Sequence, residues 1–158
     1  MMRKPANTRR SSRRAESGTQ LAELAIVLPV ILALLVAVAE FGLYFYTYTT
    51  LAKATRVGAR YISAKAYNSG EMAKARNLAV CGSANTCASG SEIISGLTTA
   101  NVEITPPIAS GLFPTTVTVR IINYNYRPLF DLSRFTGGTP WQNVAASPST
   151  TMRYLLGN

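Results

Sequence analysis

Residues 9–53 decide the fold of this chain and read RRSSRRAESGTQLAELAIVLPVILALLVAVAEFGLYFYTYTTLAK. A basic run comes first and an apolar segment follows, with no charge in residues 24–39 or 41–52 and a single Glu40 between them. A helix needs about 20 apolar residues to cross a bilayer core of roughly 30 Å. At about 1.5 Å per residue from Leu24, the far edge of that core falls near Leu43. The sequence therefore predicts one membrane-spanning helix.

Two other interpretations of the apolar segment fit it less well. A buried helix of a soluble domain is rarely this long and apolar on every face. A cleaved secretory signal has an apolar region of about 7–15 residues that ends at a small-residue site. This run is longer, and no such site closes it cleanly. We therefore expect the helix to remain on the mature protein.

Charge predicts the orientation of this helix. The cations before Gly18 are Arg3, Lys4, Arg9, Arg10, Arg13 and Arg14, against the single acid Glu16. The positive-inside rule places this end in the cytoplasm. Near the far edge lies an expected interfacial belt of aromatic residues, namely Phe41, Tyr44, Phe45, Tyr46 and Tyr48. Cations also follow the span, but less densely: Lys53, Arg56, Arg60 and Lys65. We expect the N-terminus inside the cytoplasm and the C-terminal part outside it.

The segment GTQLAE at residues 18–23 matches the processing pattern of type IV prepilins. The wider region, about residues 14–64, resembles the TadE-like pseudopilins of the tight-adherence (Flp-type) pilus system. The residues that carry the resemblance are Gly18, Glu23, Leu28-Pro29, Glu40-Phe41-Gly42 and the segment ATRVGARY at 54–61. The major Flp pilins carry an aromatic residue after the glutamate, where this chain has Leu24. The resemblance therefore favours a minor pseudopilin over the main filament subunit.

The resemblance implies roles for three residues. A prepilin peptidase would cut between Gly18 and Thr19 on the cytoplasmic side and remove residues 1–18 as a basic leader. Glu23 would become the fifth mature residue and pair with the new N-terminal amine of a neighbouring subunit during assembly. A carboxylate in an apolar membrane helix is costly unless it is paired, which agrees with this role. The residues alone leave a second interpretation open, in which Glu23 only favours the positive end of the helix by about 0.3–1 kcal/mol.

The helix is expected to continue to residue 67 and to become amphipathic beyond the span. Lys53, Arg56 and Arg60 share one face at helical spacing. The opposite face is expected to pack on a sheet, with Gly58 at the closest approach, and comprises Leu51, Ala54, Gly58, Tyr61 and Ile62. The tripeptide at 68–70, Asn-Ser-Gly, indicates the end of the helix.

Residues 68–158 predict a small extracytoplasmic α+β domain. A second helix is expected at about 71–80, and strands at 101–105, 115–127 and within 143–154. The long strand changes phase at 121–122, which indicates a bulge or burial of both faces. Pro148 places the last strand at an edge or breaks it.

The predicted fold class is therefore α+β and pilin-like. A long N-terminal transmembrane helix continues outside the membrane and packs on a small antiparallel sheet. The expected organisation is a leader at 1–18, the transmembrane and amphipathic helix at 19–67, and the extracytoplasmic domain at 68–158.

The two cysteines, Cys81 and Cys87, enclose five residues. Outside the cytoplasm this spacing predicts a disulfide that closes a short loop, and we expect it to stabilise the connection between helix and sheet and not the core. The spacing excludes a C-x-x-C redox motif. Two cysteines in a chain without histidine make a poor zinc site, so we expect no metal.

Composition argues against catalysis. The chain has no histidine, so it cannot form a Ser-His or Cys-His pair. Three of its seven acids, Glu16, Glu23 and Glu40, belong to the leader and the membrane helix, and the other four show no paired spacing. No glycine-rich phosphate-binding motif is present. We expect neither an enzyme nor a bound cofactor or small-molecule substrate. The net charge is +9, and removing the leader's +5 leaves +4, a mildly basic balance that gives little reason to expect a nucleic-acid partner.

Together these features predict a minor pseudopilin that assists biogenesis or priming of a tight-adherence type IV pilus, a structure used in cell adhesion. The expected location is the bacterial inner membrane, as a single-pass protein that can also enter the pilus. The expected partners are the membrane, a prepilin peptidase, other pilin or pseudopilin subunits and the assembly platform. Two alternatives stay open: a membrane-anchored binding module that never enters a fibre, and a tip adhesin or DNA-binding pilin. The sequence does not name the partner subunit or a position at the tip, shaft or platform.

Overall fold

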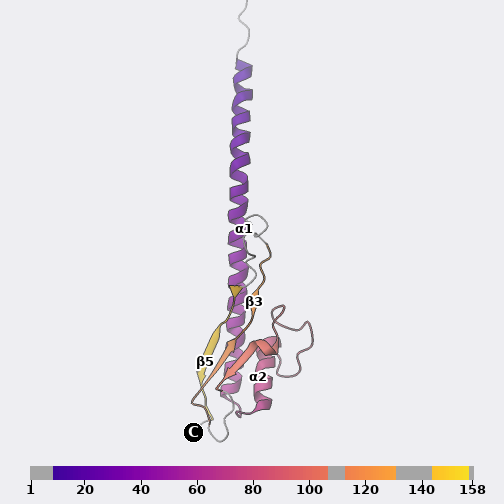
Figure 1. The fold of residues 1–158 in the computed structure, drawn as a ribbon, viewed down its shortest axis with the longest axis vertical. Coiled ribbons are helices and arrows are strands. Elements are labelled where there is room, and N and C mark those ends of the chain that lie inside the picture. Colours follow the sequence, from indigo (N-terminus) through magenta and orange to yellow (C-terminus); the bar gives the residue numbers. More distant parts are fainter. Residues whose placement is uncertain (1–8, 107–112, 131–143, 157–158) are drawn as a thin grey trace, which may run out of the picture. The chain divides into compact units, whose positions relative to one another are not determined.

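The computed structural model describes residues 9–106, 113–130 and 144–156, with side chains described from residue 18 onward. A single α-helix, α1 (Arg9–Ser63), takes up more than a third of the chain and contains Pro29 (Figure 1). The chain divides into two compact units, at residues 1–41 and 42–158. Residues of α1 belong to both units, and each unit is described here by itself.

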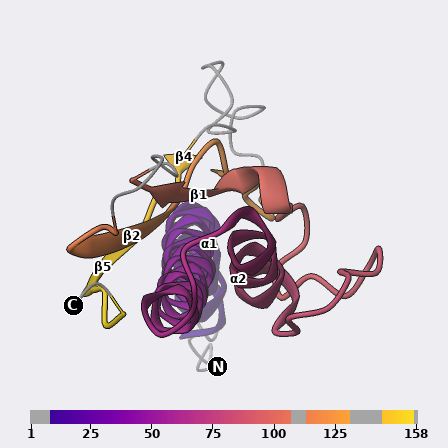
Figure 2. The same cartoon turned by 90° about the horizontal axis from the view of Figure 1, so that it is seen from below.

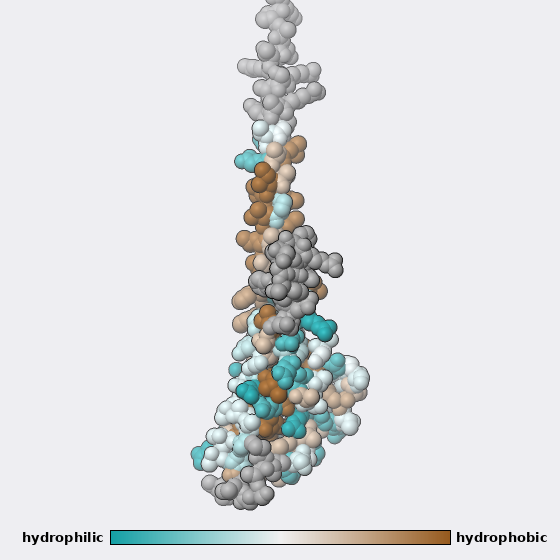
Figure 3. Space-filling view, in the orientation of Figure 1, coloured by the Kyte–Doolittle hydropathy of each residue, from teal (hydrophilic) through white to brown (hydrophobic). Residues whose placement is uncertain are grey.

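The first unit is helix alone in its described part. Its large apolar side chains are exposed on every face of α1, for example Ile26 at 73% and Leu34 at 62%. Figure 3 shows apolar residues in brown along the visible face of this part of the helix. Within the described residues one helix, Gly18–Ser63, is long and apolar enough to cross a membrane, and none of its most apolar window is buried. A helix that is hydrophobic all round needs an apolar environment, and a bilayer supplies one.

The second unit is a small α+β domain. Beside the last part of α1, its described residues form α2 (Ser69–Cys81), the short 3-10 helix η1 (Thr99–Asn101) and five strands. The strands β1 (Val102–Thr105), β2 (Thr116–Ile121) and β5 (Ser149–Arg153) form an antiparallel sheet in the order β1-β2-β5. Figure 2 shows α1 and α2 on the same side of this sheet. The predicted fold class, a long apolar helix followed by a small antiparallel sheet, is confirmed.

Strand alternation builds the core of this domain. Val117, Val119 and Ile121 of β2 are completely buried, while the intervening Arg120 is exposed. Arg120 donates to Glu103 of β1 at 2.6 Å on the outer face. Because side chains of a strand point alternately to opposite faces, one face of the sheet covers the helices and the other faces solvent.

The predicted strand at 115–127 is wrong in its second half. β2 ends at Ile121, and the chain turns at Asn123, which has a positive φ of 53°. Asparagine tolerates this left-handed backbone better than most residues. The chain then forms β3 (Asn125–Tyr126), which pairs with β4 (Val144–Ala145) in a separate two-stranded ribbon. The phase change in the sequence marks a turn between two sheets.

The last predicted strand is divided at Pro148, one of the two outcomes expected for it. β4 precedes this proline and β5 follows it, and residue 143 lies outside the described part of the chain. Proline has no N–H to donate to a sheet. The carbonyl of Pro148 still accepts a hydrogen bond from the Ile121 N–H at 3.0 Å.

The end of the long helix also differs from the prediction. α1 stops at Ser63, whose carbonyl accepts from the Leu155 N–H at 2.9 Å, so the end of the chain satisfies an orphan carbonyl of the helix. The Asn-Ser-Gly tripeptide at 68–70 begins α2. Asn68 is its N-cap, and the Asn68 side chain accepts from the Glu71 N–H at 2.8 Å. Asparagine and serine are common at helix starts as well as at helix stops, which explains the error.

Candidate assembly site

The residues of the proposed processing and assembly site lie near the start of the described side chains. Gly18, Thr19 and Glu23 are all exposed on α1. A Cβ added to Gly18 would meet no other atom within 4 Å. Thr19 and Glu23 are four residues apart, so they lie on one helix face with a rise of about 6 Å between them. All three residues therefore face the surroundings of the helix.

The same helix carries a packed face further along. Leu51 and Ile62 are completely buried, Ala54 is 4% exposed, Gly58 is buried and Tyr61 is half-buried. These are the five residues for which the sequence predicted helix–sheet packing. Lys53, Arg56 and Arg60, on the opposite face, are exposed.

Gly58 lies where three elements meet. A Cβ at this position would come within 3.3 Å of the Ala75 carbonyl oxygen in α2. It would also lie 3.5 Å from the Ala79 Cβ and 3.5 Å from a Val119 methyl group in β2. The sequence predicted the sheet as the partner of Gly58, whereas the nearest neighbour is the backbone of α2 and the sheet is second. The absence of a side chain lets both elements approach α1 closely.

Sequence reasoning missed two buried residues of this face. Thr55 and Ala59 are both completely buried. The Thr55 hydroxyl lies 2.9 Å from the Ala52 carbonyl oxygen and 2.9 Å from the Thr150 hydroxyl of β5. A buried hydroxyl is tolerated when it is hydrogen-bonded. The spacing of Leu51, Thr55, Ala59 and Ile62 along the helix was the signal that could have identified them.

A polar clamp joins α1 to α2 at the edge of the packed face. The Tyr61 hydroxyl donates to the Glu71 carboxylate at 2.6 Å, and the Lys74 ammonium donates to the other carboxylate oxygen at 2.8 Å. Both hydrogen bonds lower the pKa of Glu71 below its ordinary value, and the one from Lys74 has the larger effect. The same contact with Glu71 raises the pKa of Lys74. Both partners therefore stay charged near neutral pH.

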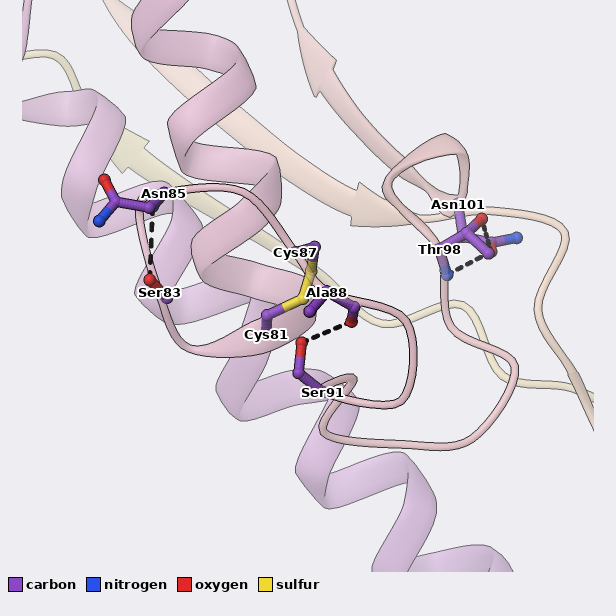
Figure 4. The surroundings of a disulfide bond; sticks show 8 residues. All are labelled: Cys81, Ser83, Asn85, Cys87, Ala88, Ser91, Thr98 and Asn101. Atoms are coloured by element: carbon purple, nitrogen blue, oxygen red, sulfur yellow. Dashed lines mark hydrogen bonds between the residues drawn. A yellow bond between two sulfur atoms is a disulfide. The ribbon is translucent and has the colours of Figure 1, made fainter.

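Cys81 and Cys87 form a disulfide with a Cα–Cα distance of 5.8 Å (Figure 4). Cys81 is the last residue of α2, and Gly82 ends the helix with a left-handed φ of 70°. Both cysteines are partly buried against the core. The bond closes a loop in the connection from α2 to the sheet, where a bridge of this size stabilises by about 2–3 kcal/mol.

The described part of the second unit also contains an open cavity of about 510 Å³. It is lined by Thr47, Ile94, Ser95, Gly96, Asn123, Tyr124, Asn125, Tyr126 and Arg127. No three potential metal-ligating side chains gather anywhere in the described residues. The cavity lining contains one cation and no acid, so it suits a neutral or anionic group.

These observations define a class of protein: a small α+β domain carried on a long helix that contains a candidate membrane span. The family model described as TadE-like protein matches residues 18–60. The matched region begins at Gly18, includes Glu23 and Gly58, and contains none of the sheet. The match confirms the resemblance to the TadE-like family that the sequence motifs indicated. No curated protein and no solved structure matches the chain.

The contact at Gly58 generates the first prediction. Gly58→Leu places a large side chain against the α2 backbone, and overpacking of this kind typically costs about 1–3 kcal/mol. Gly58→Ala should be mild, because a small shift of α2 relieves a 3.3 Å contact and alanine favours the helix. Thermal unfolding of the full chain in detergent measures the stability of both variants.

The control is Val57→Leu, at a neighbouring position that is 45% exposed, and it should leave stability unchanged. A Gly58→Leu protein as stable as the control would show that this contact does not hold the domain together.

The clamp at Glu71 generates a prediction about pH. Because its pKa is lower in the folded state, Glu71 contributes stability that is fully present above the ordinary glutamate pKa of about 4.3. That contribution disappears as the pH falls through the lowered folded-state pKa. Glu71→Gln should therefore lower the free energy of unfolding at pH 7. Between pH 5 and pH 3 the variant should lose less stability than the parent protein. Unfolding in urea at several pH values measures both effects.

The matched control for this experiment is Glu92→Gln, since Glu92 belongs to the loop after the disulfide and not to the clamp. Equal acid sensitivity of the Glu71→Gln protein and the parent would refute a stabilising role for the clamp.

Proposed function

We propose that this chain is a minor pseudopilin that assists the biogenesis or priming of a tight-adherence pilus, and that it acts by subunit assembly and not by catalysis. The observation that carries the proposal is the TadE-like match, which begins at the glycine of a prepilin-type processing motif. In the structure that motif stands exposed on a helix whose apolar surface continues on every face. The absence of histidine from the sequence supports an assembly role.

Processing would convert a membrane helix into an assembly-competent subunit. Cleavage between Gly18 and Thr19 removes the cationic leader and creates an ammonium group on Thr19. This new charge and the Glu23 carboxylate both lie on an apolar helix, where an unpaired charge is costly. Pairing with the opposite charge of a neighbouring subunit offsets that cost in both chains. The pair would fix the axial offset between adjacent helices.

The proposed orientation places the leader in the cytoplasm and the α+β domain outside it, with α1 crossing the inner membrane once. The excess of cations before Gly18 supports this orientation. The Cys81–Cys87 disulfide supports an oxidising compartment for the α+β domain. The proposed partners are a prepilin peptidase, other pilin or pseudopilin subunits and the assembly platform.

The processing step is tested at Gly18. Gly18→Val should block cleavage, because a β-branched side chain at the cleavage position would obstruct a tight peptidase site that glycine, without a side chain, can enter. N-terminal sequencing and intact mass of the protein from cells carrying the pilus system should give a mature chain that begins at Thr19, and an uncut chain for the variant. Ala25→Val, an exposed change further along α1, should be processed normally. A mature N-terminus at any other residue would disprove the processing site.

The assembly step is tested at Glu23. Both Glu23→Ala and Glu23→Gln remove the charge that pairs with the new amine, and should leave cleavage and membrane insertion intact. The amount of sheared pili should fall at least about tenfold, the change that corresponds to about 1.4 kcal/mol. Gln20→Ala, a polar and exposed position one turn earlier, is the control and should assemble normally. Normal piliation with Glu23→Gln would mean that Glu23 serves only the start of the helix.

A further inference from the structure

Three apolar side chains are exposed close to the β3–β4 ribbon. Leu129 is 71% exposed, Phe130 is 45% exposed, and Val144 of β4 is 38% exposed. Leu129 and Phe130 follow Tyr126 of β3 by three and four residues, and Val144 is the strand partner of Tyr126. Three residues of chain reach at most about 11 Å, so Leu129 stays near Tyr126. Exposed apolar side chains grouped in this way mark a surface that binds something apolar.

The contact between Tyr126 and α1 places this surface along the helix. The Tyr126 ring packs edge-to-face on the Tyr44 ring, with centroids 5.5 Å apart. Tyr44 directly follows Leu43, where the hydrocarbon core is expected to end. The headgroup layer beyond the core is roughly 5–7 Å thick, which equals about four residues of helix. Tyr126 therefore lies at the depth of the lipid headgroups.

The cavity described above opens at the same level. Thr47, on its α1 side, comes four residues after Leu43, or about 6 Å further along the helix. The lining also includes the exposed cation Arg127 and the amides of Asn123 and Asn125. Guanidinium and amide N–H groups are donors that suit a phosphate oxygen. No acid lines the cavity to oppose an anion.

We propose that the α+β domain makes a second contact with the membrane, separate from the span of α1. In this contact Leu129, Phe130 and Val144 enter the outer interface of a bilayer, and Arg127 binds a phosphate of an anionic lipid beside the cavity. Arginine, tyrosine and exposed apolar residues are the side chains that favour such an interface. Continuity with the span identifies the occupant as lipid, because Tyr126, beside this surface, packs on Tyr44, one residue beyond the expected edge of the core.

This second contact holds the domain against the membrane until the subunit is extracted. It rests on α1 spanning the bilayer, and it does not depend on Glu23 or on pilus assembly. The contact and the assembly role can therefore fail independently.

The test measures the depth of the surface in a bilayer. The full chain is reconstituted into vesicles, with Leu129→Cys labelled by an environment-sensitive fluorophore. The described native cysteines are paired in the disulfide and do not compete for the label. Ala73→Cys is the matched control, because Ala73 is exposed on α2 next to the Tyr61–Glu71 clamp, which lies eighteen helical residues beyond Leu43. Spin labels near the headgroup of the lipid should quench the probe at 129 severalfold more than the probe at 73. Equal quenching at the two positions would overturn the proposal.

A second arm tests the phosphate contact. Quenching at position 129 should increase when phosphatidylglycerol is added to phosphatidylcholine vesicles, and high salt should reverse the increase. Arg127→Gln in the Leu129→Cys background should abolish this dependence on lipid charge, whereas Arg153→Gln, an exposed cation at the end of β5, should not. If Arg127→Gln leaves the dependence on lipid charge unchanged, Arg127 does not bind lipid phosphate and that part of the proposal is wrong.

Discussion

One helix has to satisfy two environments, and this constraint organises the rest of the molecule. Along residues 24–39 α1 is apolar on every face, and most of its large side chains are exposed. From Leu51 to Ile62 the same helix buries one face completely and exposes a row of cations on the other. The small residues Ala54, Gly58 and Ala59 allow two elements to reach the buried face. The domain therefore uses the end of its own anchor as the central element of its core.

Periodicity made much of this predictable. The absence of charge over residues 24–39 predicts the span, because a buried helix of a soluble domain is rarely this long and apolar on every face. Alternation in Val117, Val119 and Ile121 predicted the buried face of β2, since a strand with one covered face must alternate. The small residues at 54 and 58 indicated a close approach on α1. In each case a repeated pattern carried the information, and a single substitution would not have hidden it.

The features that the sequence did not reveal depend on single residues in their tertiary surroundings. Asn123 adopts a positive φ, and the turn there separates β2 from β3. The phase change at 121–122 indicated a bulge or burial of both faces, but not a turn. Thr55 is a polar residue on an otherwise apolar face. Its burial is tolerated because its hydroxyl has hydrogen-bonding partners in Ala52 and Thr150. The clamp of Tyr61 and Glu71 joins residues ten positions apart on different helices. As for the candidate assembly site, Gly18 and Glu23 were proposed through resemblance, because the residues alone leave open whether Glu23 pairs during assembly or only favours the start of the helix.

The central claim is that Glu23 pairs with the N-terminal amine of another subunit, and zero-length carbodiimide crosslinking of isolated pili and membranes tests it most directly. This reagent joins a carboxylate to an amine only when the two are in contact, and mass spectrometry then identifies the linked peptides. The pair of Glu71 and Lys74, 2.8 Å apart within one chain, serves as the internal positive control. Two strains are grown in different nitrogen isotopes and mixed before assembly, for example by fusing their membranes. Links between two copies of the chain can then be distinguished from links within one copy. The account predicts a bond from Glu23 to the terminal amine of a different subunit. Recovery of the Glu71–Lys74 link with no bond from Glu23, or with a bond only to Thr19 of its own chain, would contradict it.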